Sequence, residues 1–394
     1  MEKSFNTTGT CNSNKHYMVD ISSKLDIIEK MVNKGDYFVI NRPRQYGKTT
    51  IISSLSKRLD NKCLIIRTSF EGTSNYMFQD EEKLGKELIK KFSKALRFVD
   101  IEKSEELQSA GVSIKSLGDL SDVITNFIIG CDKKVILLID EVDKASKYEL
   151  FLSFLGMLRD KFLLAVDDLD YTFHSVILVG IHDIKNLKLK VRKDEEMKLN
   201  SPWNIAVNFD LDMSFNPKEI ESMLIEYCSS NKLAMNTEKL SEKLYYYTNG
   251  YPFLVSRLCQ IIDENILSID KRLWTIEDID KSVKILLKEN NTLFDDLIKN
   301  LENNKELYAL VSEIVLNGKI VSFNISNPIV NVGYIYGVFK EEDYRVKLNN
   351  IIYEQIIYDY MVSKLEVKSD KCQFIIIEII LSRLTTNWIL KKYY

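Results

Sequence analysis

The sequence contains few of the residues that build zinc sites or disulfide frameworks. Among 394 residues there are only 3 histidines and 6 cysteines. The cysteines are spread along the chain, and none of them forms a C-x-x-C pair. A zinc site made of clustered histidines and cysteines is therefore excluded. We interpret the cysteines as buried apolar residues of a protein from a reducing compartment.

Long apolar runs and an excess of basic charge are also missing. The longest run, FIIIEIIL from Phe374, is far too short to span a bilayer. The N-terminal MEKSFNTTGTC lacks the apolar core of a secretory signal. The net charge of −3 gives no general basic field for nucleic acid or membranes. We expect a soluble cytoplasmic protein that does not bind membranes.

Five apolar segments alternate with helical patterns in the first half of the chain. Such alternation predicts βαβ units, so residues 1–212 should form an α/β core with a largely parallel sheet. The apolar content of 45% is ample for the two or three domains that this length suggests. The expected strands are Tyr37–Ile40, CLIIRTSF from Cys63, VILLIDE from Val135, SVILVGI from Ser175 and NIAVNF from Asn204.

Helical patterns dominate the second half, and they predict a helical subdomain at 213–300. Residues 301–366 then suggest a winged-helix module, with helices followed by a hairpin and a last helix. The hairpin would pair YIYGVF from Tyr334 with YRVKL from Tyr344. This module has 6 basic and 9 acidic residues, which argues against DNA and favours an intramolecular or protein contact. The tail at 367–394 continues no pattern and is either a frameshift remnant or a poorly packed helix.

The segment YFVINRPRQYGKTTIISSL from Tyr37 carries the strongest functional signal. Gly47, Lys48 and Thr49 follow a buried strand and open a helix, the placement of a phosphate-binding loop. There Lys48 would contact the β- and γ-phosphates of ATP, and the Thr49 hydroxyl would bind Mg²⁺. The earlier glycine of the motif is replaced by Arg42. Either the backbone still wraps the β-phosphate closely, or an arginine side chain supplies some of that contact. The residues that we expect around the nucleotide are Arg44, Gln45, Tyr46, Gly47, Lys48, Thr49 and Thr50.

Acidic residues end the third predicted strand. Asp140 at the tip of a buried strand suits a Mg²⁺ partner, and Glu141 could orient and activate the attacking water. After the fourth strand, His182 is either a sensor of the γ-phosphate or an ordinary residue of a turn, and the same holds for Asp183. Arg192 is either a charge-stabilising arginine or part of a solvated basic run.

Together with HYMVD from His16, SPWNIAVNF from Ser201 and TNGYPFLVSRLC from Thr248, these segments resemble bacterial AAA-like ATPases, close to the STAND group of signal-transduction ATPases. The resemblance extends to about Ser369. It implies a P-loop NTPase fold of the ASCE/AAA type, with a three-layer core, a helical lid and a winged helix. Larger relatives often carry a nuclease-like domain beyond this point, and we expect this chain to lack it.

The resemblance also implies roles for single residues. Asp140 looks like the magnesium carboxylate of the Walker B motif and Glu141 like the catalytic glutamate. Gly250 and Pro252 look like the G-x-P element that packs the lid onto the nucleotide, although a proline can simply begin a helix. Tyr17 is either a cover for the adenine or a core aromatic residue.

The leading hypothesis is an ATP-dependent molecular switch that hydrolyses ATP to ADP and phosphate, with ATP held between the core and the helical subdomain. An alternative is a nucleotide-gated DNA or protein adaptor with little turnover. A third option, a kinase for small molecules, is less favoured because no arginine-rich substrate lid accompanies the loop. The expected partner is a protein or the chain's own C-terminal module.

Overall fold

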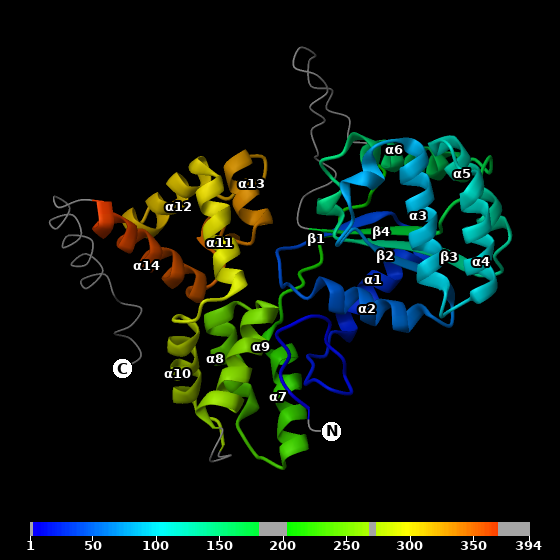
Figure 1. The fold of residues 1–394 in the computed structure, drawn as a ribbon. Coiled ribbons are helices and arrows are strands. Elements are labelled where there is room, and N and C mark those ends of the chain that lie inside the picture. Colours follow the sequence, from blue (N-terminus) through cyan, green and yellow to red (C-terminus); the bar gives the residue numbers. More distant parts are fainter. Residues whose placement is uncertain (1–2, 181–202, 268–272, 369–394) are drawn as a thin grey trace. The chain divides into compact units, whose positions relative to one another are not determined.

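The computed structural model describes residues 3–180, 203–267 and 273–368 (Figure 1). The chain divides into two compact units. The core unit is Ile21–Met213, and the second unit combines Met1–Asp20 with Ser214–Tyr394. No helix within the described ranges is long and apolar enough to cross a membrane.

A four-stranded parallel sheet forms the centre of the core unit, in the order β1-β4-β3-β2. Its strands are β1 (Phe38–Asn41), β2 (Cys63–Ser69), β3 (Lys134–Asp140) and β4 (Ser175–Gly180). The strands β1, β3 and β4 are nearly continuous in buried apolar residues, because both faces of the sheet are covered by helices, whereas β2 ends in the partly buried residues Arg67, Thr68 and Ser69. The α/β fold with a parallel sheet is thus confirmed.

The fifth predicted strand is largely wrong. NIAVNF contributes only an isolated parallel bridge between Val207 and Phe38, in which the Val207 amide donates to the Tyr37 carbonyl at 2.8 Å. The chain turns just before this bridge, where the Ala206 amide donates to the Trp203 carbonyl. This turn removes the extended residues that a longer ladder would need.

Helices cover the two faces of the sheet (Figure 1). The inward side chains alternate along β3, so Val135, Leu137 and Ile139 pack into the core cluster with α3, α5 and α6. By the same alternation Asp140 faces the other side, where α1 and α2 lie. The helices are α1 (Ser22–Lys34), α2 (Lys48–Leu59), α3 (Glu81–Leu96), α4 (Ile101–Ala110), α5 (Leu117–Ile129) and α6 (Glu149–Val166), and the short 3₁₀ turns are η1 (Asn75–Phe78), η2 (Gly111–Ser113) and η3 (Val142–Lys144).

The second unit is mostly helical. Its first helices are α7 (Pro217–Asn231), α8 (Thr237–Thr248), α9 (Pro252–Ile261), the π-helical turn η5 (Ile262–Ile266) and α10 (Ile276–Leu286). The elements that follow are α11 (Thr292–Asn303), α12 (Lys305–Asn317), α13 (Pro328–Ile335), β5 (Phe339–Glu342), β6 (Arg345–Leu348) and α14 (Ile351–Lys368). The division into residues 1–212, 213–300, 301–366 and 367–394 stays a prediction.

The predicted hairpin exists, but its first strand was placed too early. Tyr334 belongs to α13, and β5 begins only at Phe339. The Asn327 side chain caps α13 by accepting from the Ile329 amide, and Gly337 at φ 69° carries the chain out of the helix. The first residues of the apolar run from Tyr334 therefore end a helix, and only the last residue of the run, Phe339, lies in a strand.

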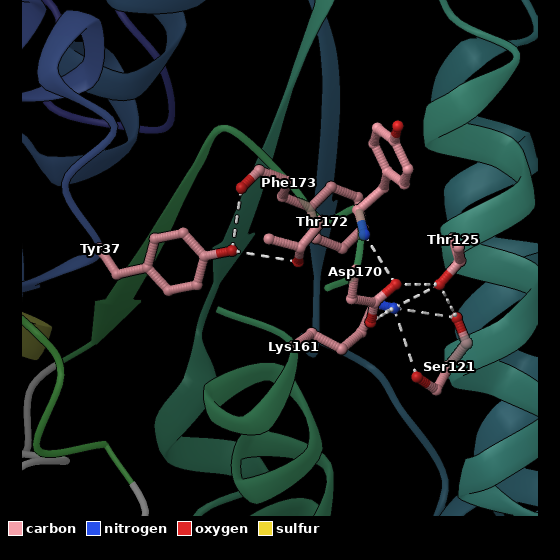
Figure 2. A network of polar contacts seen from close by, with 8 residues as sticks. Tyr37, Ser121, Thr125, Lys161, Asp170, Thr172 and Phe173 are labelled. Atoms are coloured by element: carbon pink, nitrogen blue, oxygen red, sulfur yellow. Dashed lines mark hydrogen bonds and ion pairs between the residues drawn. The ribbon is translucent and has the colours of Figure 1, made fainter. Parts of the chain in front are cut away.

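A buried lysine is held by polar groups in the core unit (Figure 2). The Lys161 side chain is 1% exposed, and its ammonium lies 2.6 Å from the Asp170 carboxylate. It also donates to the Thr125 hydroxyl at 2.6 Å and to the carbonyl and hydroxyl of Ser121. These contacts link α6, α5 and the loop before β4. Because every acceptor is in place, the charge can be buried without a large penalty.

Replacing Asp170 by asparagine should destabilise the core unit by about 1–2 kcal/mol, because the buried ammonium loses its counter-ion but keeps an amide oxygen. Burial raises the pKa of Asp170, but hydrogen bonds from Lys161 and Thr125 outweigh it and hold this pKa below its usual value. The stability gained from this carboxylate is therefore present above its ordinary pKa and lost as the pH falls through the lowered one. Denaturant unfolding of the parent and Asp170→Asn, at neutral and acidic pH, measures both effects. Equal pH dependence of the two proteins would contradict the assignment.

Candidate functional site

The loop between β1 and α2 contains two residues with a left-handed backbone. Gly47 is the N-cap of α2 and adopts φ 76°, and Gln45 adopts φ 55°. Arg42 has a negative φ. The position where the motif usually carries glycine therefore needs no left-handed backbone in this chain, which explains how arginine is accommodated there.

The Arg42 side chain is engaged within the core unit. Its guanidinium donates to the carbonyls of Asn41 at 2.8 Å and Leu211 at 2.5 Å. It also lies over the ring of Phe209, 5.4 Å from the centroid. Arg42 thus connects the start of the loop to residues 209–211. In this position its side chain does not supply the phosphate contact that the sequence offered as one alternative.

Lys48 begins α2 and is only 8% exposed. Its ammonium donates to the carbonyls of Arg42 at 2.7 Å and Pro43 at 2.8 Å. Burial lowers the pKa of Lys48 to about 8, although the attraction of Asp143, Glu141 and Asp140 opposes that shift. The loop carbonyls therefore hold a cation at the helix N-terminus, where phosphate oxygens would also be favoured.

Thr49 and Asp140 meet at the end of β3. The Thr49 hydroxyl donates to one Asp140 carboxylate oxygen at 3.3 Å, and the Glu141 amide donates to the other at 2.9 Å. A hydroxyl and a carboxylate side by side are oxygen donors of the type that Mg²⁺ prefers, so these residues fit the ion. The structure brings together the two residues that the sequence assigned to the metal.

Glu141 follows Asp140 with a left-handed backbone, at φ 54°. Burial raises the pKa of Glu141, and the neighbouring Asp140 charge raises it further. A non-glycine residue in this conformation is uncommon and is often retained at functional sites. The backbone turn places this carboxylate beside Asp140 and half-buried, which suits a group that accepts a proton.

Asp140→Asn should raise the unfolding free energy of the nucleotide-free chain, on the order of 1 kcal/mol. Burial raises the pKa of Asp140 above its usual value of 3.8. The carboxylate therefore destabilises the fold increasingly as the pH rises above 3.8 and fully once the pH exceeds the raised pKa, and asparagine removes that penalty. Thermal unfolding in EDTA tests this, and the gain should vanish below pH 3.8. A variant that is less stable at neutral pH would contradict the prediction.

Sequence reasoning missed two charged residues beside this site. Arg67 lies in β2 next to Leu138 of β3, is half-buried and interacts electrostatically with Asp140. Burial lowers the pKa of this guanidinium. Asp143 lies in η3 and attracts Lys48. The available signals were an arginine inside an apolar strand and a third acidic residue in the run DEVD.

Other predicted site residues are not part of this cluster. Tyr17 belongs to the second unit, where its ring lies 4.9 Å from Phe5 and 5.2 Å from Tyr227, and its hydroxyl accepts from Asn231. It is buried, as the core-aromatic alternative expects. His182, Asp183 and Arg192 lie outside the described residues. Around the loop, Arg44 and Gln45 are exposed, Thr50 is half-buried and Tyr46 is buried.

Gly250 and Pro252 also belong to the second unit. Gly250 adopts φ 70°, and a Cβ atom there would lie 1.9 Å from the Phe215 carbonyl oxygen. The two backbones are further joined by the Phe215 amide, which donates to the Gly250 carbonyl at 2.8 Å. Pro252 is in the first turn of α9. Glycine is thus required at position 250 because a side chain would clash with Phe215 and because the backbone is left-handed. Contact of Gly250 or Pro252 with a nucleotide stays a prediction.

Several solved structures align with this chain at low sequence identity. The Walker-type ATPase PABY2304 of Pyrococcus abyssi aligns with a TM-score of 0.59 and 12% identity, over 90% of this chain and 99% of its own. The ORC2 protein of Aeropyrum pernix gives a TM-score of 0.49 at 11% identity, over 91% and 98%. The RuvB Holliday junction branch migration motor of Thermotoga maritima gives 0.40 at 14%, over 86% and 94%. At these identities the likeness to the Pyrococcus protein shows the fold alone.

Among curated proteins nothing matches the chain. The profile of a protein family does match it, over residues 7–359, and the family is described as an AAA-like domain. That range includes the phosphate loop, the acidic end of β3 and most of the second unit. The chain therefore belongs to the AAA-like domain family.

Proposed function

We propose that this protein binds ATP with Mg²⁺ and hydrolyses it to ADP and phosphate, and that it works as a molecular switch of the STAND type. The observation that carries the proposal is the contact between the start of α2 and the end of β3. Lys48 and Thr49 at the start of the helix lie with Asp140 and Glu141 at the end of the strand, linked by the Thr49–Asp140 hydrogen bond of 3.3 Å.

Each of these residues has a distinct role in the proposed reaction. The amides at the α2 N-terminus and the Lys48 ammonium bind the phosphates and offset the negative charge that develops on them. Thr49 and Asp140 would hold Mg²⁺, which supplies charge neutralisation for the phosphate oxygens. Glu141 orients a water molecule and accepts its proton as the water oxygen attacks phosphorus and the bond to the ADP oxygen breaks.

Glu141→Gln should retain ATP binding and lose turnover by about 100-fold or more, because glutamine keeps the shape but cannot accept the proton. Nucleotide titration and phosphate release measure the two properties separately. The matched control is Glu105→Gln, which removes the same charge from an exposed position on α4. If Glu141→Gln hydrolyses ATP as fast as the parent, Glu141 is not the catalytic base.

The corner Asn249–Pro252, which we call the NGYP corner, supports the switch. Gly250 packs against Phe215, the second residue after the core unit ends at Met213. On its other side the corner contacts elements of residues 301–366. The Lys340 ammonium of β5 lies 3.5 Å from the Asn249 side chain, and the buried rings of Tyr251 and Tyr353 lie 5.5 Å apart.

These contacts suggest how nucleotide state would be transmitted. A shift of the chain at Met213 would act on Phe215, and the tight contact with Gly250 would pass it to the corner. Packed interfaces tend to have discrete alternatives and do not deform continuously, so the corner can relay a small movement to α14. We therefore propose that residues 301–366 report the nucleotide state of the core to a partner.

The partner is proposed to be a protein. Residues 321–323 add an antiparallel edge to the β5–β6 hairpin, through Ser322 beside Arg345 and the Val346 amide bonded to the Val321 carbonyl. This edge supports a winged-helix-like module. The tip of the hairpin carries Glu341 and Glu342 at the end of β5 and Asp343 in the turn, however, and such a tip repels a duplex. DNA binding that weakens steeply with salt in a gel-shift assay would overturn this choice of partner.

A further inference from the structure

The short turn η3 lies directly after the catalytic end of β3 and holds Asp143 in a fixed place. Its backbone is closed by the Ala145 amide on the Val142 carbonyl at 3.0 Å. The Ser146 hydroxyl also donates to the Asp143 carbonyl at 2.9 Å. Val142 is fully buried, while Asp143 is half-buried. The backbone at Asp143 is therefore fixed by the turn, and its side chain is partly shielded from solvent.

The Asp143 carboxylate lies against Gly180, the last residue of β4. A Cβ atom at position 180 would be 2.8 and 2.9 Å from its two oxygens. Such distances are shorter than real Cβ contacts, so a side chain there would have to displace the carboxylate. Gly180 does not adopt a positive φ. Its lack of a side chain thus makes room for Asp143 and does not serve a special backbone conformation.

A continuous set of contacts leads from Asp143 to the phosphate loop. The Gly180 carbonyl accepts from the Arg42 amide at 3.1 Å. The carbonyls of Arg42 and Pro43 in turn accept from the Lys48 ammonium. The negative charges of Asp143, Glu141 and Asp140 all attract the Lys48 ammonium. Asp143 is thus linked to Lys48 by its charge and to the loop by its contact with Gly180.

We propose that Asp143 is a positioning residue that holds the Lys48 ammonium in place at the start of α2, within the space left by Gly180. The proposal deepens the function proposed above and rests on it for its consequence, since a correctly placed Lys48 is what the β-phosphate meets. Asp143 itself touches no reacting atom. The alternative is that Asp143 only closes the η3 turn, in which case it is independent of Lys48.

A double-mutant cycle in the unfolding of the nucleotide-free chain separates the two alternatives. The variants are Asp143→Asn, Lys48→Met and the pair, and the cycle is repeated with Asp143→Ser so that the conclusion does not rest on one substitution. If the carboxylate holds the ammonium, the two sites should be coupled by about tenfold in the unfolding equilibrium constant. Additive effects in both cycles would overturn the proposal.

Binding of ADP in EDTA provides the functional readout. Asp143→Asn should weaken ADP by about tenfold, the lower end of what loss of a supporting side chain costs a site. Asp122→Asn removes the same charge from the exposed face of α5 and should leave ADP affinity unchanged. Equal ADP affinity for Asp143→Asn and the parent would overturn the proposal. A parent that binds no ADP would refute the proposed function, while the coupling in unfolding would still decide whether Asp143 holds Lys48.

Discussion

Replacing Lys48 by alanine is expected to weaken binding of ATP and ADP by about 100-fold or more. The ammonium is buried at the start of α2 and is held by two loop carbonyls, so alanine removes a cation that the fold places at this helix N-terminus. Hydrogen bonds to charged groups contribute about 1.5–3 kcal/mol each, and the ammonium can make more than one to the phosphates. Titration with a fluorescent nucleotide measures the loss.

The control for this substitution is Lys57→Ala. Lys57 lies on the same helix and carries the same charge, but it is exposed and about two and a half turns beyond Lys48. Its removal should leave nucleotide affinity within a factor of about 2, since an exposed charge at this distance is largely screened. If both variants bind ATP like the parent, the nucleotide is not held at this loop.

Gly250→Ala is expected to destabilise the second unit by about 3–5 kcal/mol. Alanine at φ 70° adopts a conformation that L-residues disfavour, and its Cβ atom would lie 1.9 Å from the Phe215 carbonyl oxygen. Relief requires that Phe215 move away from Gly250, which breaks the hydrogen bond of 2.8 Å between their backbones. Denaturant unfolding measures the change.

Gly318→Ala isolates the part of this effect that comes from the close contact. Gly318 adopts a similar φ of 66° at the end of α12, but nothing lies within 4 Å of a Cβ atom built there. Its substitution should cost only the conformational part, about 1–2 kcal/mol. Equal losses for the two variants would show that the backbone of Phe215 yields easily, and that the NGYP corner is not the rigid relay proposed here.

Features that depend on neighbouring residues could be predicted from the sequence. Apolar runs gave four strands near their true positions, and the order strand, loop, helix placed Lys48 and Thr49 at a helix start. The run ending in Asp140 put a carboxylate at the edge of a parallel sheet, where the carboxyl ends of strands gather. These predictions follow from local periodicity, which a single sequence displays directly.

Features that depend on contacts with distant residues could not be predicted from the sequence. The replacement of glycine by Arg42 is understood only with Leu211 and Phe209, which lie far along the chain. Gly180 looks ordinary until Asp143 is seen against it, and Lys161 looks like a surface lysine until its partners on α5 are known. The segment at Val207 forms only an isolated bridge and no full strand, because the chain turns at Trp203.

The most direct test of the account is phosphate release from ATP by the purified chain. The parent with Mg²⁺ should release phosphate steadily, Glu141→Gln should bind ATP without releasing it, and Lys48→Ala should do neither. DNA in the assay should not change the rate. A parent chain that neither binds ATP nor releases phosphate, with Mg²⁺ present, would contradict the central claim.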